Sequence, residues 1–136
     1  MKVLGRYAVV IALLSSFVLA SPAEATDFTA KTSLGIKVNP AHIQKGDSVK
    51  VSGHLKSKKN ACVKDMKIQL FSKAKGKDWK QVAHTFTKND GSYAFTRHPK
   101  KTKKFQTKFP GKTSGVHPHH HICLESESVV KKVKVT

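Results

Sequence analysis

Alternation of apolar and polar residues at a two-residue period dominates the chain. In the segment 47–55 the odd positions from Val49 onward are apolar or small and the even positions are polar, which is typical of a strand with one buried face. Downstream of residue 25 no segment has the period of a helix. The pattern predicts seven strands, at residues 34–38, 47–55, 66–70, 79–87, 92–96, 103–109 and 129–135.

Turn residues separate these segments. Asn89-Asp90-Gly91 lies between two alternating segments, and glycine accepts a positive φ without steric cost, so a tight hairpin is expected there. The stretch 73–78 contains Gly76 and several charges and is expected to be a solvated tip. Seven short strands with turn signals between them predict an all-β, antiparallel, seven-stranded sandwich. The stretch 110–127 fits no element.

The two-residue period also assigns side chains to faces. Tyr93 and Phe95 share one face and are expected in the core. His84 is in phase with its apolar neighbours and is expected to be packed, and Trp79 is expected to pack beside a hairpin. Gly53 interrupts an alternating strand, which indicates close approach of a facing side chain. In the last strand the residues expected to face inward are Val129, Val133 and Val135.

The first 25 residues have the organisation of an export signal. Lys2 and Arg6 precede an apolar run at 8–14, and Ala23-Glu24-Ala25 has the small residues that a signal peptidase requires. The apolar run is short for a membrane-spanning helix. We expect cleavage before Thr26, with a site at Ala20 as the alternative, leaving residues 26–136 as one secreted, extracellular domain without a transmembrane segment.

The expected mature chain is strongly cationic. Without Lys2, Arg6 and Glu24, the 26 basic and 8 acidic residues of the chain become 24 and 7, a formal charge of +17. Such a charge is also found in disordered polycations. Repeated Val, Ile, Leu and Phe positions at a strand period argue instead for a folded domain, whose core must act against repulsion among its lysines.

Cys62 and Cys123 are the two cysteines of the chain. In an exported protein an even number of cysteines favours a disulfide. For a loop of this length the chain-entropy model gives a stabilisation of roughly 4 kcal/mol. A disulfide between the two is therefore expected, and a metal-binding or catalytic role for either thiol is the alternative.

Several segments together resemble a known family of modules. The pieces are "NPAHIQKGDSVKVSGHL", "MKIQLFSKAKGKDWKQVAHTFTKNDGSYAFT", "KKFQTKFPGK" and "SVVKKVKVT". Their order resembles the immunoglobulin-like sandwich modules of bacterial secreted and cell-surface proteins, over residues 33–135. The resemblance implies a fold, and it implies little about function because such modules carry many unrelated activities. Carboxypeptidase-regulatory and pilin-type sandwiches share the Asp-Gly hairpin and remain alternatives.

One segment concentrates metal-ligating atoms. Imidazoles suit zinc, copper and nickel, and in an extended chain His119 and His121 would lie on the same side and could bind one ion together. An exposed polar loop without a metal is the simpler interpretation, and no cofactor is otherwise indicated. The candidate ligands are His117, His119, His120 and His121.

Lysine runs are the other candidate binding feature. Lysine is a hydrated point charge, whereas arginine gives the planar recognition used to read base edges, and Arg97 is the only arginine after residue 25. Diffuse attraction to an anionic cell-wall polymer, polysaccharide or membrane surface is therefore expected rather than sequence-specific binding of nucleic acid. Solvated strand faces that only maintain solubility are the alternative. The candidate polyanion-binding residues are Lys56, Lys58, Lys59, Lys100, Lys101, Lys103 and Lys104.

The sequence does not favour an enzyme. The seven acidic residues after residue 25 are scattered, and the chain has no nucleophile elbow or phosphate-cradling glycine loop. Three functions remain: a non-catalytic binding or structural module at the cell surface, a metal-binding extracellular protein, and a cationic membrane-active or wall-binding protein.

Overall fold

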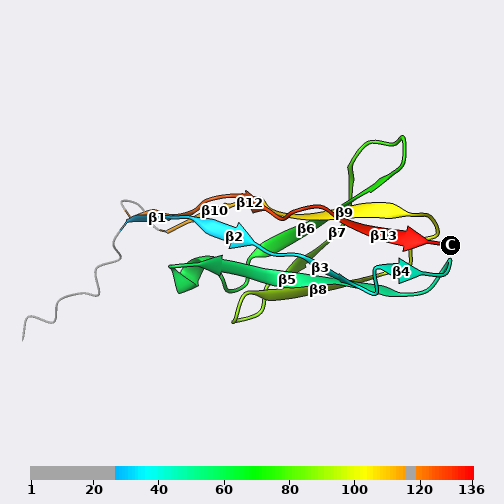
Figure 1. Ribbon diagram of the computed structural model, residues 1–136. Helices are drawn as coiled ribbons and strands as arrows, with labels where there is room; N and C mark the ends of the chain where they lie inside the picture. Colours follow the sequence, from blue (N-terminus) through cyan, green and yellow to red (C-terminus); the bar gives the residue numbers. More distant parts are fainter. Residues whose placement is uncertain (1–26, 116–118) are drawn as a thin grey trace, which may run out of the picture.

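The computed structural model describes residues 27–115 and 119–136. These residues form an all-β fold with thirteen strands and one short 3-10 helix, η1 (Asn60–Cys62) (Figure 1). The prediction of an all-β chain is confirmed. The predicted signal segment, residues 1–25, lies outside the described residues. Within the described ranges, no helix has the length and apolar character needed to cross a membrane.

The first sheet consists of β2 (Thr32–Leu34), β3 (Lys37–Asn39), β5 (Val49–Ser57) and β8 (Ser92–Arg97). β5 is central: β2 and β3 pair antiparallel with one of its edges, and β8 pairs antiparallel with the other. Along β5, Val49 and Val51 are buried while Lys50 is exposed. This is the alternation that the sequence predicts for the segment 47–55.

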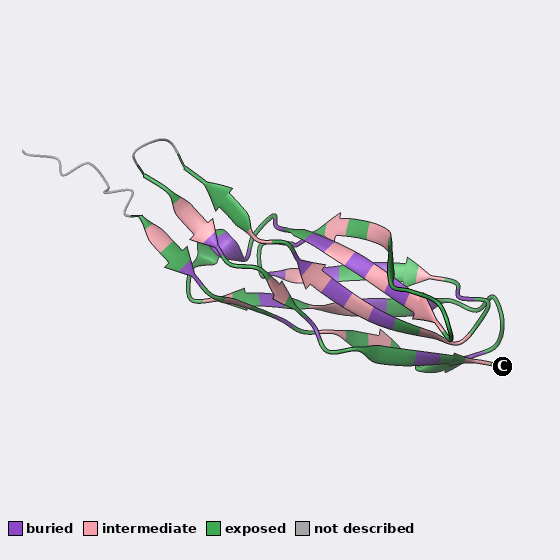
Figure 2. Cartoon of the chain, turned by 90° about the horizontal axis from the view of Figure 1, so that it is seen from above, coloured by how far each residue is buried: buried purple, intermediate pink, exposed green. Residues whose placement is uncertain are grey.

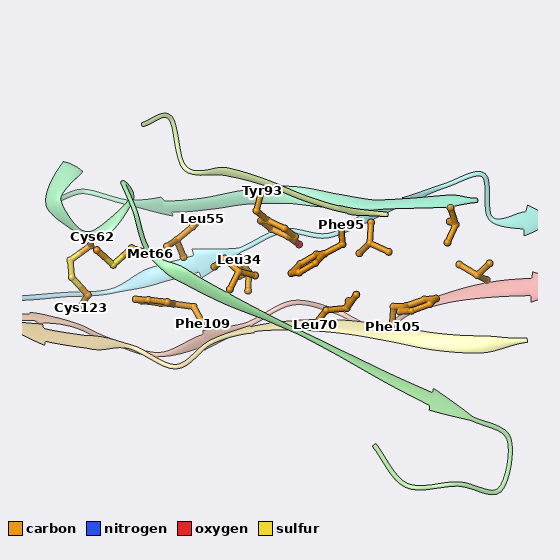
Figure 3. Packing of buried hydrophobic residues seen from close by; sticks show 14 of the residues in the cluster. Leu34, Leu55, Cys62, Met66, Leu70, Tyr93, Phe95, Phe105, Phe109 and Cys123 are labelled. Carbon is orange, nitrogen blue, oxygen red and sulfur yellow. A yellow bond between two sulfur atoms is a disulfide. The ribbon is translucent and has the colours of Figure 1, made fainter. Parts of the chain in front are cut away.

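The second sheet consists of β4 (His42–Ile43), β6 (Lys67–Ala74), β7 (Lys80–Phe86), β9 (Lys103–Phe109), β12 (Ser126–Glu127) and β13 (Lys131–Val135). The strand order is β4-β13-β9-β6-β7, and β12 also pairs with β9. β13 and β4 run parallel. The predicted purely antiparallel arrangement is therefore wrong at this edge of the sheet. The two sheets face each other with the core between them (Figure 3).

A third, small sheet extends the molecule at one end. It consists of β1 (Phe28–Ala30), β10 (Lys112–Ser114) and β11 (His121–Cys123), with β1 parallel to β11. The pairing of β10 with β11 continues the register of β9 with β12. The described parts of the segment 110–127, which the sequence could not place, therefore form the outer part of one long hairpin. This end carries mainly exposed and half-buried residues (Figure 2).

The core is apolar and drawn from both main sheets. Figure 3 shows Tyr93 and Phe95 pointing from the first sheet toward Leu70 and Phe105 of the second. Tyr93 and Phe95 are both buried, as their spacing predicts. The fully buried apolar side chains are Val49, Val51, Leu55, Ile68, Leu70, Phe105, Phe109 and Val133.

The predicted strand 34–38 is interrupted. β2 ends at Leu34 and β3 begins at Lys37, because the chain bends inward at Gly35. A Cβ on Gly53 would lie 2.0 Å from the carbonyl oxygen of Gly35. The Gly35 carbonyl thus occupies the inward position that a side chain at residue 53 would take. The close approach predicted at Gly53 is present, but the nearest group is this backbone carbonyl, with the Tyr93 side chain behind it at 2.8 Å.

The Asp90-Gly91 turn forms, but it does not close a hairpin. Gly91 has φ +84°, and its amide donates to the carbonyl of Lys88 at 2.9 Å. The strands on either side separate, since β7 pairs with β6 and β8 pairs with β5. The turn therefore carries the chain from the second sheet to the first, and the predicted hairpin is wrong.

Two predicted packing positions, those of His84 and Val129, are wrong. The register of β6 and β7 shifts at Leu70/Phe71, and this places His84 on the exposed face of β7. Trp79 directly precedes β7 of the β6–β7 hairpin and is 36% exposed, so most of its surface is covered. β12 and β13 both pair with β9, but their registers on β9 differ by one residue. This shift turns Val129, which lies between them, outward, and it is 67% exposed.

Tyr93 joins the two sheets through its hydroxyl. The hydroxyl donates to the Gly35 carbonyl at 2.6 Å and lies 2.8 Å from the Thr107 hydroxyl. Burial raises the pKa of Tyr93 to about 12 because the phenolate is costly to desolvate.

Tyr93→Phe is expected to lower the free energy of unfolding by roughly 1–3 kcal/mol, since the Gly35 and Thr107 oxygens lose their partner. A group whose pKa is higher in the folded than in the unfolded state contributes stability that is fully present at pH values below its unfolded-state pKa. We therefore expect a stability contribution that is complete below pH 10 and lost toward pH 12. Urea unfolding of both proteins across this range checks it. The difference between them should shrink with pH, and a constant difference would contradict this account.

Candidate functional site

The predicted disulfide is present. Cys62 in η1 and Cys123 in β11 are bonded, their Cα atoms are 5.5 Å apart, and both residues are buried. The bond lies at the end of the core where the third sheet begins (Figure 3). It therefore attaches the long hairpin to the chain that follows β5, and neither sulfur is available as a nucleophile or metal ligand.

The seven lysines predicted to bind polyanions do not form one surface. Lys56 is near the end of β5, and Lys58 and Lys59 follow it toward η1, whereas Lys103 and Lys104 begin β9. β5 ends beside η1, while β9 begins near the C-terminus, at the opposite end of the molecule (Figure 1). The structure separates the first group from Lys100, Lys101, Lys103 and Lys104.

The second sheet instead brings together lysines that are distant in sequence. Lys104 is directly opposite Lys73 on β6 and directly opposite Lys132 on β13. Directly opposite residues project from the same face, with Cβ atoms about 5 Å apart. Lys73, Lys104 and Lys132 therefore form a row across three neighbouring strands, which we call the lysine row.

A groove of about 580 Å³ runs beside the lysine row. Lys75 and Lys103 also line it, and no acidic residue does. Within the described ranges Lys108–Glu127, at 3.9 Å, is the only lysine–carboxylate ion pair. The charges of the row are therefore not neutralised by carboxylates of this part of the chain, and like charges at opposite positions destabilise a sheet.

Aromatic side chains flank the lysine row on the same face. Phe71 is two residues from Lys73 on β6, and the ammonium of Lys108 lies 4.8 Å from the centre of its ring. Further along, Phe86 is 55% exposed, and its ring meets the imidazole of His84 edge-on. The face thus combines ammonium groups with apolar ring surfaces.

The described candidate histidines, His119, His120 and His121, belong to the outer part of the long hairpin and have separate neighbours. The Nδ1 of His119 is 3.9 Å from a carboxylate oxygen of Asp27, and the backbone amide of His120 donates to the same oxygen. The ring of His121 stacks on Phe28, with centroids 4.5 Å apart. His117 lies outside the described residues. Among the described residues no three His, Cys, Asp or Glu side chains are placed to hold one metal ion, so the zinc or copper site stays a prediction.

Sequence reasoning missed the lysine row because its members come from three separate segments. Lys73 and Lys132 each belong to short lysine runs, but nothing in a single strand indicates which strands will be neighbours. The registers of β6 and β13 on β9 supply that information. No protein-family model and no curated protein sequence matches the chain.

Proposed function

We propose that this protein is an extracellular, non-catalytic immunoglobulin-like module that binds polyanions at the cell surface. The observation that carries the proposal is the lysine row, an un-neutralised line of ammonium groups across β6, β9 and β13. A bound chain of phosphate, sulfate or carboxylate groups would relieve the repulsion within the row. Binding and stability would then be coupled.

The strand order supports the immunoglobulin-like part of the proposal. The chain passes from the first sheet through β4 in the second sheet and back to β5. It then forms the β6–β7 hairpin in the second sheet, returns to the first for β8 and finishes in the second. Repeated crossing between two facing sheets is the connectivity of Greek-key sandwiches.

The disulfide supports an extracellular location. Disulfides persist in oxidising compartments and are rare where glutathione keeps thiols reduced. Cys62 and Cys123 are buried, and they join segments 61 residues apart. The signal-like features of the first 25 residues point to the same location.

The test is retention of the residue 26–136 protein on immobilised heparin across a salt series. The variant Lys73→Gln/Lys104→Gln/Lys132→Gln should elute at lower salt. Its slope of log K against log salt should be smaller by about 1 for each lysine that contacts an anion. The variant should also be at least as stable as the parent protein, because like-charge repulsion is removed.

The matched control removes the same charge elsewhere, through Lys45→Gln/Lys64→Gln/Lys112→Gln at three exposed positions. An equal loss of retention in both variants would show that binding follows net charge alone, and it would overturn the assignment to the lysine row. Absence of retention, or retention insensitive to salt, would refute polyanion binding. Dye release from anionic vesicles would favour the membrane-active alternative instead.

A further inference from the structure

A second cationic hollow lies on the other side of the molecule, on the outer face of the first sheet. Its volume is about 610 Å³, within the range of small-molecule sites. It is lined by the β2–β3 connection, by β5 and by β8. None of the lysines of the lysine row lines it.

The inward bend at Gly35 explains why the surface is hollow there. The amide of Gly35 still donates to the His54 carbonyl at 3.0 Å, but its carbonyl turns inward to the Tyr93 hydroxyl. The chain between β2 and β3 therefore lies deeper than the strands on either side of it. The absence of a side chain at Gly53 permits this depth.

Small side chains form the floor of the hollow. On the outer face, Ser52 is directly opposite Lys37 on one side and Ala94 on the other. Ser92 is directly opposite His54 in the next row. The small side chains of Ser52, Ala94 and Ser92 leave the space that larger residues would fill.

The rim of the hollow is positively charged. Four lysines line it, and no aspartate or glutamate does. The hydroxyls of Ser33, Ser52 and Ser92 and the imidazole of His54 are also in the lining. Besides the His54 imidazole, the only aromatic ring in the lining belongs to Tyr93, which is buried. The lysines are Lys37, Lys50, Lys56 and Lys88.

This combination selects a class of ligand. Several ammonium groups favour an oxyanion such as phosphate, and serine hydroxyls can pair with hydroxyl groups of the ligand. The lining has no exposed Phe, Tyr or Trp ring, so it lacks the stacking platforms on which single-strand nucleic-acid sites hold a nucleobase. A phosphate group on an aliphatic, hydroxylated body matches these features.

The hollow also continues along the surface. A neighbouring depression of about 330 Å³ shares Ser33 and Lys56 with it and adds Lys31 and Lys58 to its lining. Positive charge therefore extends from the hollow toward η1 as a track. A ligand with repeated phosphates would occupy the track, whereas a single small phosphate compound would fill only part of it.

We propose that this hollow binds a phosphate-bearing unit of a linear polyol phosphodiester polymer, with adjacent units along the track toward η1. The inference rests on the proposed function, because it gives a site and a chemical class to part of the polyanion binding. It also assigns the two faces separate roles: the lysine row attracts polyanions of any kind, and the hollow distinguishes among them.

The test is a titration of the residue 26–136 protein with a defined poly(glycerol phosphate) oligomer, followed by the chemical shifts of backbone amides. The shifts should concentrate on residues of β5, β8 and the β2–β3 connection. Ala94→Phe adds a ring to the floor without changing charge, and it should weaken oligomer binding at least fivefold. Gln81→Phe adds the same ring at an exposed position on β7 and should change binding less than twofold.

Other outcomes have definite meanings. Shifts confined to the second sheet, or equal affinities of the Ala94→Phe and parent proteins, would overturn the hollow while leaving the proposed function intact if heparin retention persists. Monomeric glycerol 3-phosphate binding as tightly as the oligomer would refute the polymer. If Ala94→Phe does not fold, Lys37→Gln/Lys50→Gln compared with Lys45→Gln/Lys64→Gln gives the same test, with the same fivefold loss expected in the first pair.

Discussion

Replacing Cys62 and Cys123 with alanine is expected to lower the free energy of unfolding by roughly 4 kcal/mol. The bond closes a loop of 61-residue separation, so its loss enlarges the unfolded ensemble. The folded state also loses the attachment of β11 to η1. The third sheet should then open first, because Ala30 and Cys123 are the only buried residues of its three short strands.

Guanidinium unfolding of the double variant and of the reduced parent protein measures this loss. Hydrogen exchange should show faster exchange at β1, β10 and β11 than in β6 and β9, even under conditions where the variant remains folded. A variant as stable as the oxidised parent, or uniform exchange in all strands, would show that the core holds this end without the disulfide.

Gly53→Ala is expected to be the most damaging single methyl addition in the first sheet. The new Cβ would lie 2.0 Å from the Gly35 carbonyl oxygen and 2.8 Å from the Tyr93 hydroxyl. The first of these neighbours is backbone and cannot rotate away. Either β5 or the β2–β3 connection must shift and break the bond from Tyr93 to Gly35. We expect a loss of roughly 3 kcal/mol of stability.

Gly35→Ala is the matched control, because its Cβ would meet only the His54 carbonyl oxygen, at 3.8 Å. This is ordinary contact, and a loss below about 1 kcal/mol is expected. Thermal unfolding compares the two variants. If Gly53→Ala folds, its affinity for the glycerol phosphate oligomer should also fall, since a displaced connection changes the shape of the hollow. Similar stabilities for both variants would mean that the inward bend at Gly35 is not a fixed feature.

Much of the fold could be predicted from local patterns in the sequence. The strand 103–109 was predicted with the bounds that β9 has, and β5, β6, β7 and β8 overlap their predicted segments. These strands alternate strongly because one face packs on the core, and such alternation depends only on neighbours along the chain. The even number of cysteines, in a chain with an export-like signal, predicted their pairing.

Errors arose where a residue's environment depends on distant parts of the chain. The Asp90-Gly91 turn has the local conformation that its sequence favours, but the pairing of β7 with β6 and β8 with β5 decides what it connects. His84 and Val129 face solvent because of register offsets. Such offsets are set by cross-strand packing and leave no mark in a single strand's pattern.

The sequence by itself determined the β-rich character, the excess of positive charge and the covalent link between Cys62 and Cys123, because these follow from residue types and their local spacing. Only the tertiary structure decided which lysines are neighbours. Lys73, Lys104 and Lys132 are neighbours because β6 and β13 both pair with β9 in registers that place these three residues opposite one another. The hollow beside Ser52 exists because Gly35 and Gly53 let two strands approach closely. Both surfaces combine segments far apart in the chain, so only strand pairing creates them.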